Sequence, residues 1–299
     1  MDLAVTAQRV PLTGEIVLAG SFRMGPGGKG ANAATALARL GACSMLVGCV
    51  GDDQLGFMEM EALKREGVNL DGVRTALGES TGVGIIIVDG NKENTVLVVM
   101  GANSSLTVEF ALGSLEGAWE ILDALVVNFE VPEPVVAAVV TEGRRKNVPV
   151  IVDAGPSRRY EAATWRGATV LSPNRLEAET LLGREIRTEK ELRGAARELL
   201  AAGPESVVIK LGGDGCLVCT EEGLTHVPAF KVGVVDTTGA GDAFTAALAF
   251  GIAQGRTLAE AVELGTAAGA LATTRFGTMP SMPTYSEVGE FLRVEREKP

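Results

Sequence analysis

Apolar and polar positions along this chain follow two patterns, and the longer one begins near residue 104. There, short apolar runs alternate with helix-like segments, and a polar residue follows each run. The strand-like runs cover residues 124–129, 148–152, 169–171 and 206–211, and helices are expected over 132–145, up to Gly183, over 243–250, over 257–276 and at the C-terminus. Strands that alternate with helices form a parallel sheet covered on both faces. The pattern therefore predicts an α/β fold with three layers, α/β/α, around a mostly parallel central sheet.

The first hundred residues follow a different pattern. Residues 3–24 are short alternating segments broken at proline and glycine, which predicts small strands. Two apolar runs, 83–88 and 95–100, flank the polar stretch 89–94 and predict a β-hairpin with no helix between its strands. We expect these segments to form a small antiparallel sheet separate from the main body. A buried strand over 44–50 and a helix over 55–66 lie between them in the sequence.

Polar residues stand just beyond the predicted apolar strands. They are Glu130, Asp153, Asn174, Lys210 and Asp236. Parallel sheets bind ligands at the carboxyl ends of their strands. A single polar residue at such a position is usually part of a loop, but five of them predict one shared site.

The stretch Asp236-Thr237-Thr238-Gly239-Ala240-Gly241-Asp242 precedes an apolar helical run. A glycine-rich turn at a helix start leaves backbone N–H groups without intrahelical partners, and these groups favour an anion. Asp242 in the first turn can take a proton from a hydroxyl group while the N–H groups stabilise a transferring phosphoryl group. The alternative is an aspartate that only caps an ordinary helix.

A second glycine-rich stretch covers residues 24–32, Met-Gly-Pro-Gly-Gly-Lys-Gly-Ala-Asn, and opens an alanine-rich helix that ends at Gly41. Its G-x-G-x-x-G at 25–30, with Asp52 and Asp53 further on, matches the dinucleotide-binding pattern of nicotinamide dehydrogenases. That pattern should follow directly on a buried strand, whereas only a weak apolar run precedes it here. It is not a Walker loop, because glycine follows Gly-Lys where serine or threonine is required.

Composition excludes several classes of protein. A chain of 299 residues allows one large α/β domain or two smaller ones, and without a long linker we expect a single domain over residues 1–299. A net charge of −11 argues against nucleic acid and membrane surfaces as partners. Neither a signal peptide nor a membrane span is visible, so we expect a cytoplasmic protein.

The cysteines and the histidine do not predict a metal, redox or catalytic site. Cys216 and Cys219 have metal-site spacing, but residues three apart on a strand point to opposite faces. His226 is the single histidine and is expected at the surface or at a sheet edge. Catalysis must therefore rest on carboxylates, amides, lysine and backbone groups.

The two glycine-rich stretches, in this order, resemble the signatures of the ribokinase-like family of carbohydrate kinases. The resemblance covers nearly the whole chain, from Asp2 to about Ser281. Further matches are Glu79-Ser80-Thr81-Gly82-Val83, Gly101-Ala102-Asn103, Asn174 with Glu177, and Leu211-Gly212-Gly213-Asp214-Gly215. The resemblance implies transfer of the γ-phosphoryl group of ATP to the 5-hydroxyl of D-ribose. A kinase for another sugar or a nucleoside is the alternative within the family.

The resemblance also implies roles for individual residues. Asp242 would be the general base, and the amides of Gly239, Ala240 and Gly241 would form the anion hole. Sugar-contacting positions would be Asp2, Gly28, Lys29, Gly30, Asn32, Glu130 and Asp242. Nucleotide-contacting positions would be Asn174, Lys210, Gly212, Gly213, Gly215, Gly241 and Thr266. Glu177 would organise Mg²⁺, and a K⁺ loop would comprise Asp236, Thr238, Ala272, Arg275, Gly277 and Ser281. The small sheet, from about 3–24 and 80–103, would be a lid that often pairs two subunits into a homodimer.

Two departures from the family pattern bear on activity. The family's first strand, with its Gly-Ser-x-Asn, precedes the residue that matches Met1, so the main sheet is expected to lack one strand and the sugar site one asparagine. Asp153-Ala154-Gly155-Pro156 stands where Asn-Pro-Ala-Pro is common. Either the true start lies upstream of Met1, or the protein tolerates the loss of the first strand with weakened binding. A protein that binds nucleotide or sugar without turnover stays a further alternative.

Overall fold

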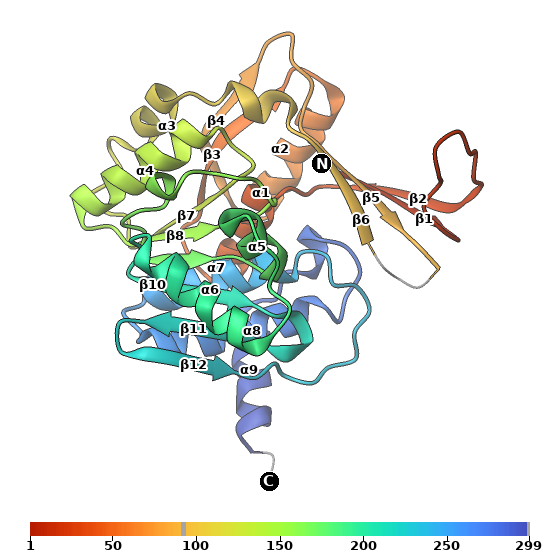
Figure 1. The fold of residues 1–299 in the computed structure, drawn as a ribbon. Coiled ribbons are helices and arrows are strands. Elements are labelled where there is room, and N and C mark those ends of the chain that lie inside the picture. Colours follow the sequence, from red (N-terminus) through yellow and green to blue (C-terminus); the bar gives the residue numbers. More distant parts are fainter. Residues whose placement is uncertain (91–93, 298–299) are drawn as a thin grey trace.

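A six-stranded sheet forms the centre of the computed structural model, which describes residues 1–90 and 94–297 (Figure 1). Its strand order is β12-β11-β10-β9-β8-β7. The strands are β7 (Leu125–Asn128), β8 (Val150–Asp153), β9 (Val170–Ser172), β10 (Ser206–Lys210), β11 (Cys216–Thr220) and β12 (Gly223–Val227). Strands β7 to β10 run parallel, and β11 and β12 add two antiparallel ladders at one edge. The prediction of a mostly parallel central sheet is confirmed.

Helices cover both faces of this sheet. One face carries α3 (Val108–Leu115), α4 (Glu133–Lys146), α5 (Arg175–Leu182) and α6 (Glu189–Ala201); the other carries α1 (Lys29–Arg39), α7 (Ala240–Ala253) and α8 (Leu258–Ala272), with α9 (Tyr285–Arg296) packed outside α8. Strand β8 shows why both layers are needed. Val152 belongs to the same buried cluster as Val136 of α4, whereas its neighbour Ile151 clusters with Leu248 of α7. Because successive side chains point to opposite faces, an all-apolar strand is stable only between two layers.

A second, two-stranded parallel sheet lies beside the first. It consists of β3 (Met45–Gly51) and β4 (Asn69–Ala76), and α2 (Gln54–Arg65) packs on it. Among the described residues no strand pairs with the outer edges of β3 and β7. A cavity of about 2290 Å³ begins between these edges and continues to the carboxyl ends of the main strands. The main sheet is thus divided, in line with the expectation that it lacks a strand.

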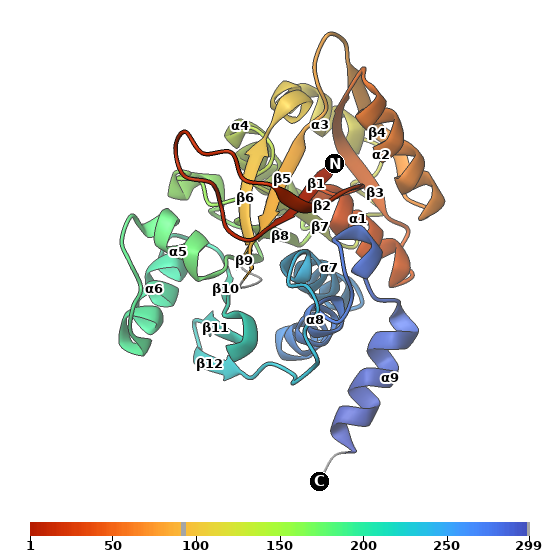
Figure 2. The same cartoon turned by 90° about the vertical axis from the view of Figure 1, so that its right-hand side faces the viewer.

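The segments expected to form a lid build a four-stranded sheet with the order β2-β1-β5-β6. Its strands are β1 (Asp2–Ala7), β2 (Ala19–Gly25), β5 (Val83–Val88) and β6 (Asn94–Val99). It projects from the body at the right of Figure 1 and faces the viewer in Figure 2. The expectation of a purely antiparallel sheet was wrong, because β1 and β5 pair in parallel. The hairpin is present, although residues 91–93 of its turn lie outside the described residues.

Smaller differences concern element ends and single residues. The helix expected over 257–276 ends at Ala272, and the 3₁₀ turns are η1 (Gly101–Ser105), η2 (Ala162–Thr164), η3 (Gly212–Asp214) and η4 (Met279–Ser281). His226 is exposed on the edge strand β12, as expected. In the described parts of the chain, no helix has the length and apolar character of a membrane span.

Candidate active site

The N-terminus of α7 forms the centre of the site. Gly239 occupies the N-cap position with φ 80°, and no side chain caps the helix. A left-handed conformation favours glycine, and a Cβ at this position would also lie 3.2 Å from the Thr278 Cα. No side-chain acceptor therefore competes for the first N–H groups of α7, although the Ala240 N–H donates to the Thr237 carbonyl at 3.3 Å. This is the geometry of an anion site.

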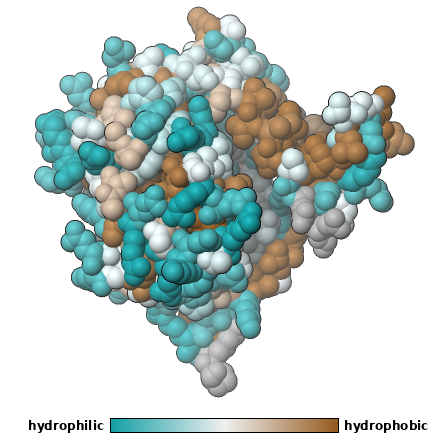
Figure 3. All heavy atoms as spheres, in the orientation of Figure 1, coloured by the Kyte–Doolittle hydropathy of each residue, from teal (hydrophilic) through white to brown (hydrophobic). Residues whose placement is uncertain are grey.

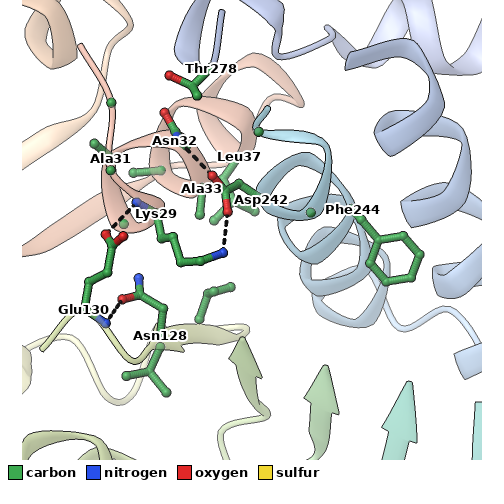
Figure 4. Close-up of a pocket in the computed structure, with 18 of the residues that line it drawn as sticks. Lys29, Ala31, Asn32, Ala33, Leu37, Asn128, Glu130, Asp242, Phe244 and Thr278 are labelled. Carbon is green, nitrogen blue, oxygen red and sulfur yellow. Dashed lines mark hydrogen bonds and ion pairs between the residues drawn. The ribbon is translucent and has the colours of Figure 1, made fainter. Parts of the chain in front are cut away.

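Asp242 lies in the first turn of α7, buried, with both carboxylate oxygens held by groups from α1. Lys29 Nζ donates to Oδ1 at 3.0 Å, and Asn32 Nδ2 donates to Oδ2 at 2.8 Å (Figure 4). Two sequence segments more than 200 residues apart thus meet at one carboxylate. The arrangement fixes the orientation of a group that can accept a proton from a substrate hydroxyl.

Glu130 follows β7 and lies on the side of Lys29 that faces away from Asp242 (Figure 4). Its Oε2 accepts the Lys29 backbone N–H at 2.9 Å, and its own N–H donates to Asn128 Oδ1 at 2.8 Å (Figure 4). Burial raises the pKa of Glu130 to about 7, and the charge of Lys29 offsets part of that rise. A carboxyl group with this pKa exchanges its proton near neutral pH.

Asp2, at the base of the lid, forms another wall. Its Oδ2 accepts the Thr278 hydroxyl at 2.7 Å. The backbone of Gly27 passes so close that an added Cβ would lie 2.1 Å from this oxygen. Burial raises the pKa of Asp2, while the bond from Thr278 opposes the rise.

Asp153 connects the two lysines of the site. Lys29 Nζ donates to its Oδ1 at 3.3 Å, and Lys210 Nζ donates to its Oδ2 at 3.0 Å. Burial disfavours the charged carboxylate, but Lys210 and Lys29 outweigh this and lower the pKa of Asp153. Burial likewise disfavours the charged Lys29, but Asp153 and Asp242 prevail and raise its pKa well above the ordinary value.

Asn174 and Glu177 form a capping box at the start of α5. Asn174 Oδ1 accepts the Glu177 N–H at 2.9 Å, and Glu177 Oε2 accepts the Asn174 N–H at 2.7 Å. Burial raises the pKa of Glu177. Its Oε1 faces Gly155, where an added Cβ would lie 2.6 Å away. The capping box thus holds a buried carboxylate at the end of β9, beside Lys210.

Most residues that the sequence assigned to the site line the cavity. They are Asp2, Gly28, Lys29, Gly30, Asn32 and Glu130 on one side, Asn174, Glu177, Lys210, Gly212, Gly213, Gly215 and Thr266 on the other, and Thr238, Gly239, Ala240, Gly241 and Asp242 between them. The remaining residues of the expected K⁺ loop, Asp236, Ala272, Arg275, Gly277 and Ser281, do not line it. Three residues of that expected loop are in contact, because Asp236 accepts the N–H groups of Thr238 and Gly277, each at 3.0 Å.

Three residues of the site were not predicted: Asn128, Thr245 and Thr278. Asp153 was predicted only as one of five polar residues at strand ends, without a role of its own. Asn128 ends β7, so strand position was a usable signal for both. Thr245 and Thr278 lie in an apolar helical run and a loop, where nothing in the sequence marks them. Among the described residues, no three histidine, cysteine or acidic side chains are grouped as a metal-ion site.

The dehydrogenase alternative for residues 25–30 fails on context. The glycine-rich stretch follows β2, an exposed lid strand, rather than a buried strand of the main sheet. Its Lys29 forms ion pairs with Asp153 and Asp242, a role that the dinucleotide-binding pattern does not assign to this position. The fingerprint requires a buried strand of a βαβ unit before the turn, whereas β2 is exposed and pairs antiparallel with β1.

Comparisons with known proteins show which family this chain resembles over its length. The model of the pfkB family carbohydrate kinases matches residues 1–285. The ribokinase of Bacillus subtilis is 38% identical over 98% of this chain and 96% of its own, and the deoxyribokinase of Salmonella typhi is 31% identical over 98% and 95%. The structure of Arabidopsis thaliana ribokinase complexed with ribose and ATP superposes with a TM-score of 0.85 at 29% identity, over 98% of this chain and 95% of that one.

Proposed function

The chain belongs to the pfkB family of carbohydrate kinases, and we propose that it transfers the γ-phosphoryl group of ATP to the 5-hydroxyl of D-ribose, giving ribose 5-phosphate and ADP. One observation carries the proposal. Asp242 lies at a helix N-terminus that no side chain caps, and Lys29 and Asn32, which could bind sugar hydroxyls, contact its carboxylate. The same cavity is lined by Lys210 and by the capping box of Asn174 and Glu177. An acceptor hydroxyl and a phosphoryl group can therefore meet at one carboxylate.

Asp242 is proposed as the general base for the acceptor hydroxyl. The N–H groups of residues 239–241 would stabilise the charge on the transferring group, because they are fixed before the reaction and cost no reorganisation. Lys210 would add a positive charge on the donor side: a Cβ at Gly241 would lie 3.7 Å from its Nζ. The residues of this chain thus supply base, anion hole and cation without a covalent intermediate.

The sugar is proposed to bind among Asp2, Lys29, Asn32 and Glu130. Asn32 Oδ1 is buried and has no hydrogen-bond partner within the described residues, although Nδ2 of the same side chain is bonded to Asp242. A buried acceptor without a partner is costly, and a sugar hydroxyl would satisfy it. Carboxylates at Asp2 and Glu130 would accept further hydroxyl groups. Such convergent acceptors are what a polyol requires.

Mg²⁺ is proposed to accompany the nucleotide near Glu177. Mg²⁺ with nucleotides is usually held by one or two carboxylates, water and the phosphates rather than by a protein cage. Glu177 is a buried carboxylate that lines the cavity beside the proposed nucleotide residues, which fits that role. When bound, the ion would neutralise phosphate charge. Replacing Glu177 by glutamine should raise the Mg²⁺ concentration needed for half-maximal rate, and an unchanged requirement would remove this assignment.

K⁺ is proposed to bind the loop around Asp236, with carbonyl groups from the segment 272–281. The carboxylate already accepts Thr238 and Gly277, so the loop has a fixed shape around a negative charge. A cation there would neutralise Asp236 below the anion hole. We expect faster turnover in potassium than in sodium buffers; equal rates would argue against the loop site.

The lid is proposed as the contact of a homodimer. Figure 3 shows apolar side chains gathered on the projecting sheet. The strand registers put Phe22 and Leu97 on the same face of it, where they are 63% and 57% exposed. An exposed apolar face of this kind commonly marks an interface. Leu97→Lys should convert a dimer into a monomer in a solution mass measurement, and an unchanged mass would contradict this contact. A cytoplasmic location stays a prediction.

The acceptor is tested by measuring ADP release with a panel of pentoses, hexoses and nucleosides. D-Ribose should have the highest kcat/KM, and 2-deoxy-D-ribose is the essential comparison because one relative is a deoxyribokinase. A clear preference for another acceptor would replace ribose but keep the kinase. Nucleotide or sugar binding without turnover would favour a protein that only binds.

A further inference from the structure

Asp153 accepts four hydrogen bonds at the end of β8, and the donors fall into two matched pairs. Oδ1 accepts Lys29 Nζ at 3.3 Å and the Gly155 N–H at 2.9 Å. Oδ2 accepts Lys210 Nζ at 3.0 Å and the Thr245 hydroxyl at 2.9 Å. Each oxygen therefore holds one ammonium group and one neutral donor. The residue is 3% exposed, so water does not replace these partners.

The two lysines serve opposite sides of the reaction centre. Besides Asp153, Lys29 Nζ also donates to Asp242 Oδ1 at 3.0 Å, on the side where the acceptor sugar is proposed to bind. Lys210 Nζ lies near Gly241 at the N-terminus of α7 and donates to Thr245 Oγ1 at 3.4 Å. Lysine side chains have four rotatable bonds and hold a position only when their ammonium group is fixed. Among the described residues, Asp153 is the one carboxylate that forms an ion pair with both.

Thr245 adds a third connection. It stands three residues after Asp242 on α7, so the two side chains lie on the same face of the helix. Through its hydroxyl group, Asp153 ties that face to the end of β8. A single carboxylate thus sets the positions of two cations and of the helix that carries the base.

We propose that Asp153 is a positioning residue that aligns the acceptor-side Lys29 with the phosphoryl-side Lys210 across Asp242. This inference rests on the proposed roles of those three residues. Phosphoryl transfer depends mainly on positioning and fixed charges, so loss of the shared carboxylate should slow the chemical step more than it weakens substrate binding.

The first test is Asp153→Asn, which keeps the size of the side chain and removes its charge. We expect kcat to fall about 10–100-fold, a loss typical of small misplacements at a reaction centre, with each KM changed less than about 5-fold. Glu133→Gln is the matched control. Glu133 also accepts a threonine hydroxyl and a backbone N–H, from Thr164 and Glu161, but unlike Asp153 it accepts no hydrogen bond from Lys29 or Lys210. Its kcat should equal that of the parent.

A double-mutant cycle with Lys210→Met separates positioning from a general structural effect. Because Asp153 holds Lys210 as well as Lys29, adding Asp153→Asn to Lys210→Met should lower kcat by a smaller factor than it does in the parent. Independent, multiplying losses would overturn the proposal, as would an Asp153→Asn kcat within about 2-fold of the parent.

If Asp153→Asn does not fold, Thr245→Val tests the positioning role of Asp153 instead. It removes one donor to Asp153 and leaves every charge in place. A kcat reduced about 3–10-fold at unchanged KM supports the proposal, and a parental kcat overturns it. All variants are measured with the acceptor that the parent phosphorylates fastest. A wrong choice of sugar is then detected in the parent, independently of the role of Asp153.

Discussion

The lid and the main sheet are both β-structure, but they are stabilised in different ways. All four residues of β8 are buried, and four of the five in β10 are buried as well. All six residues of β6 are exposed, and six of the seven in β2. The main strands lie between two helix layers, whereas the lid is held mostly by its own ladders and by contacts at its base.

The difference in burial suits the body and the lid to different functions. The buried strands hold Glu130, Asp153 and Lys210 at fixed positions at their carboxyl ends. Beyond Asp2 at its base, the described lid residues contact the body near the site at two further points. Asn94 Nδ2 donates to Thr238 Oγ1 at 3.1 Å, and the Arg23 guanidinium lies 4.2 Å from the centre of the Phe276 ring. Elements with few buried contacts open at low free-energy cost. We infer that the body supplies stability and chemistry, and that the lid supplies closure over the sugar.

The largest effect is expected for the base in the body. Asp242→Asn should lower kcat about 10²–10⁴-fold with little change in sugar affinity, because an amide cannot accept the hydroxyl proton. Steady-state kinetics and sugar binding by calorimetry would measure the two quantities. Activity within a few-fold of the parent would show that Asp242 is not the base.

A paired measurement compares burial in the two sheets. Ile151→Ala on β8 should lower the free energy of unfolding by about 2–5 kcal/mol, because Ile151 is completely buried. Leu97→Ala on β6 should cost less than about 1 kcal/mol in a monomer. Denaturant unfolding at low protein concentration checks both. A Leu97 effect that grows with protein concentration would show that a second copy buries the lid, and equal costs in dilute protein would contradict the comparison.

The smallest effect is expected at the contact between lid and anion loop. Asn94→Ala removes one hydrogen bond, worth about 0.5–1.5 kcal/mol, and should raise the KM for the sugar about 2–10-fold without lowering kcat. ATP hydrolysis in the absence of sugar should rise as well, since a lid excludes water. A fall in kcat at constant KM would place Asn94 in the chemistry instead of in closure.

Local patterns in the sequence were sufficient for the elements of the body. Apolar runs longer than three residues predicted β7, β8 and β10, and the polar residue after each of them lies in the site. The turn before Asp242 was readable because glycine at positive φ and an uncapped helix start are local properties. Resemblance to a kinase family then supplied the substrate and the roles of the residues, which periodicity alone does not contain.

Only the tertiary structure decided the long-range connections. The parallel pairing of β1 with β5, the bond from Thr278 to Asp2, the opening between β3 and β7, and the double ion pair of Asp153 join residues that are far apart in sequence. Strand periodicity determines which face a side chain occupies but not which strand lies beside it. Pairing depends on how the whole chain packs, and that packing places one carboxylate between two lysines.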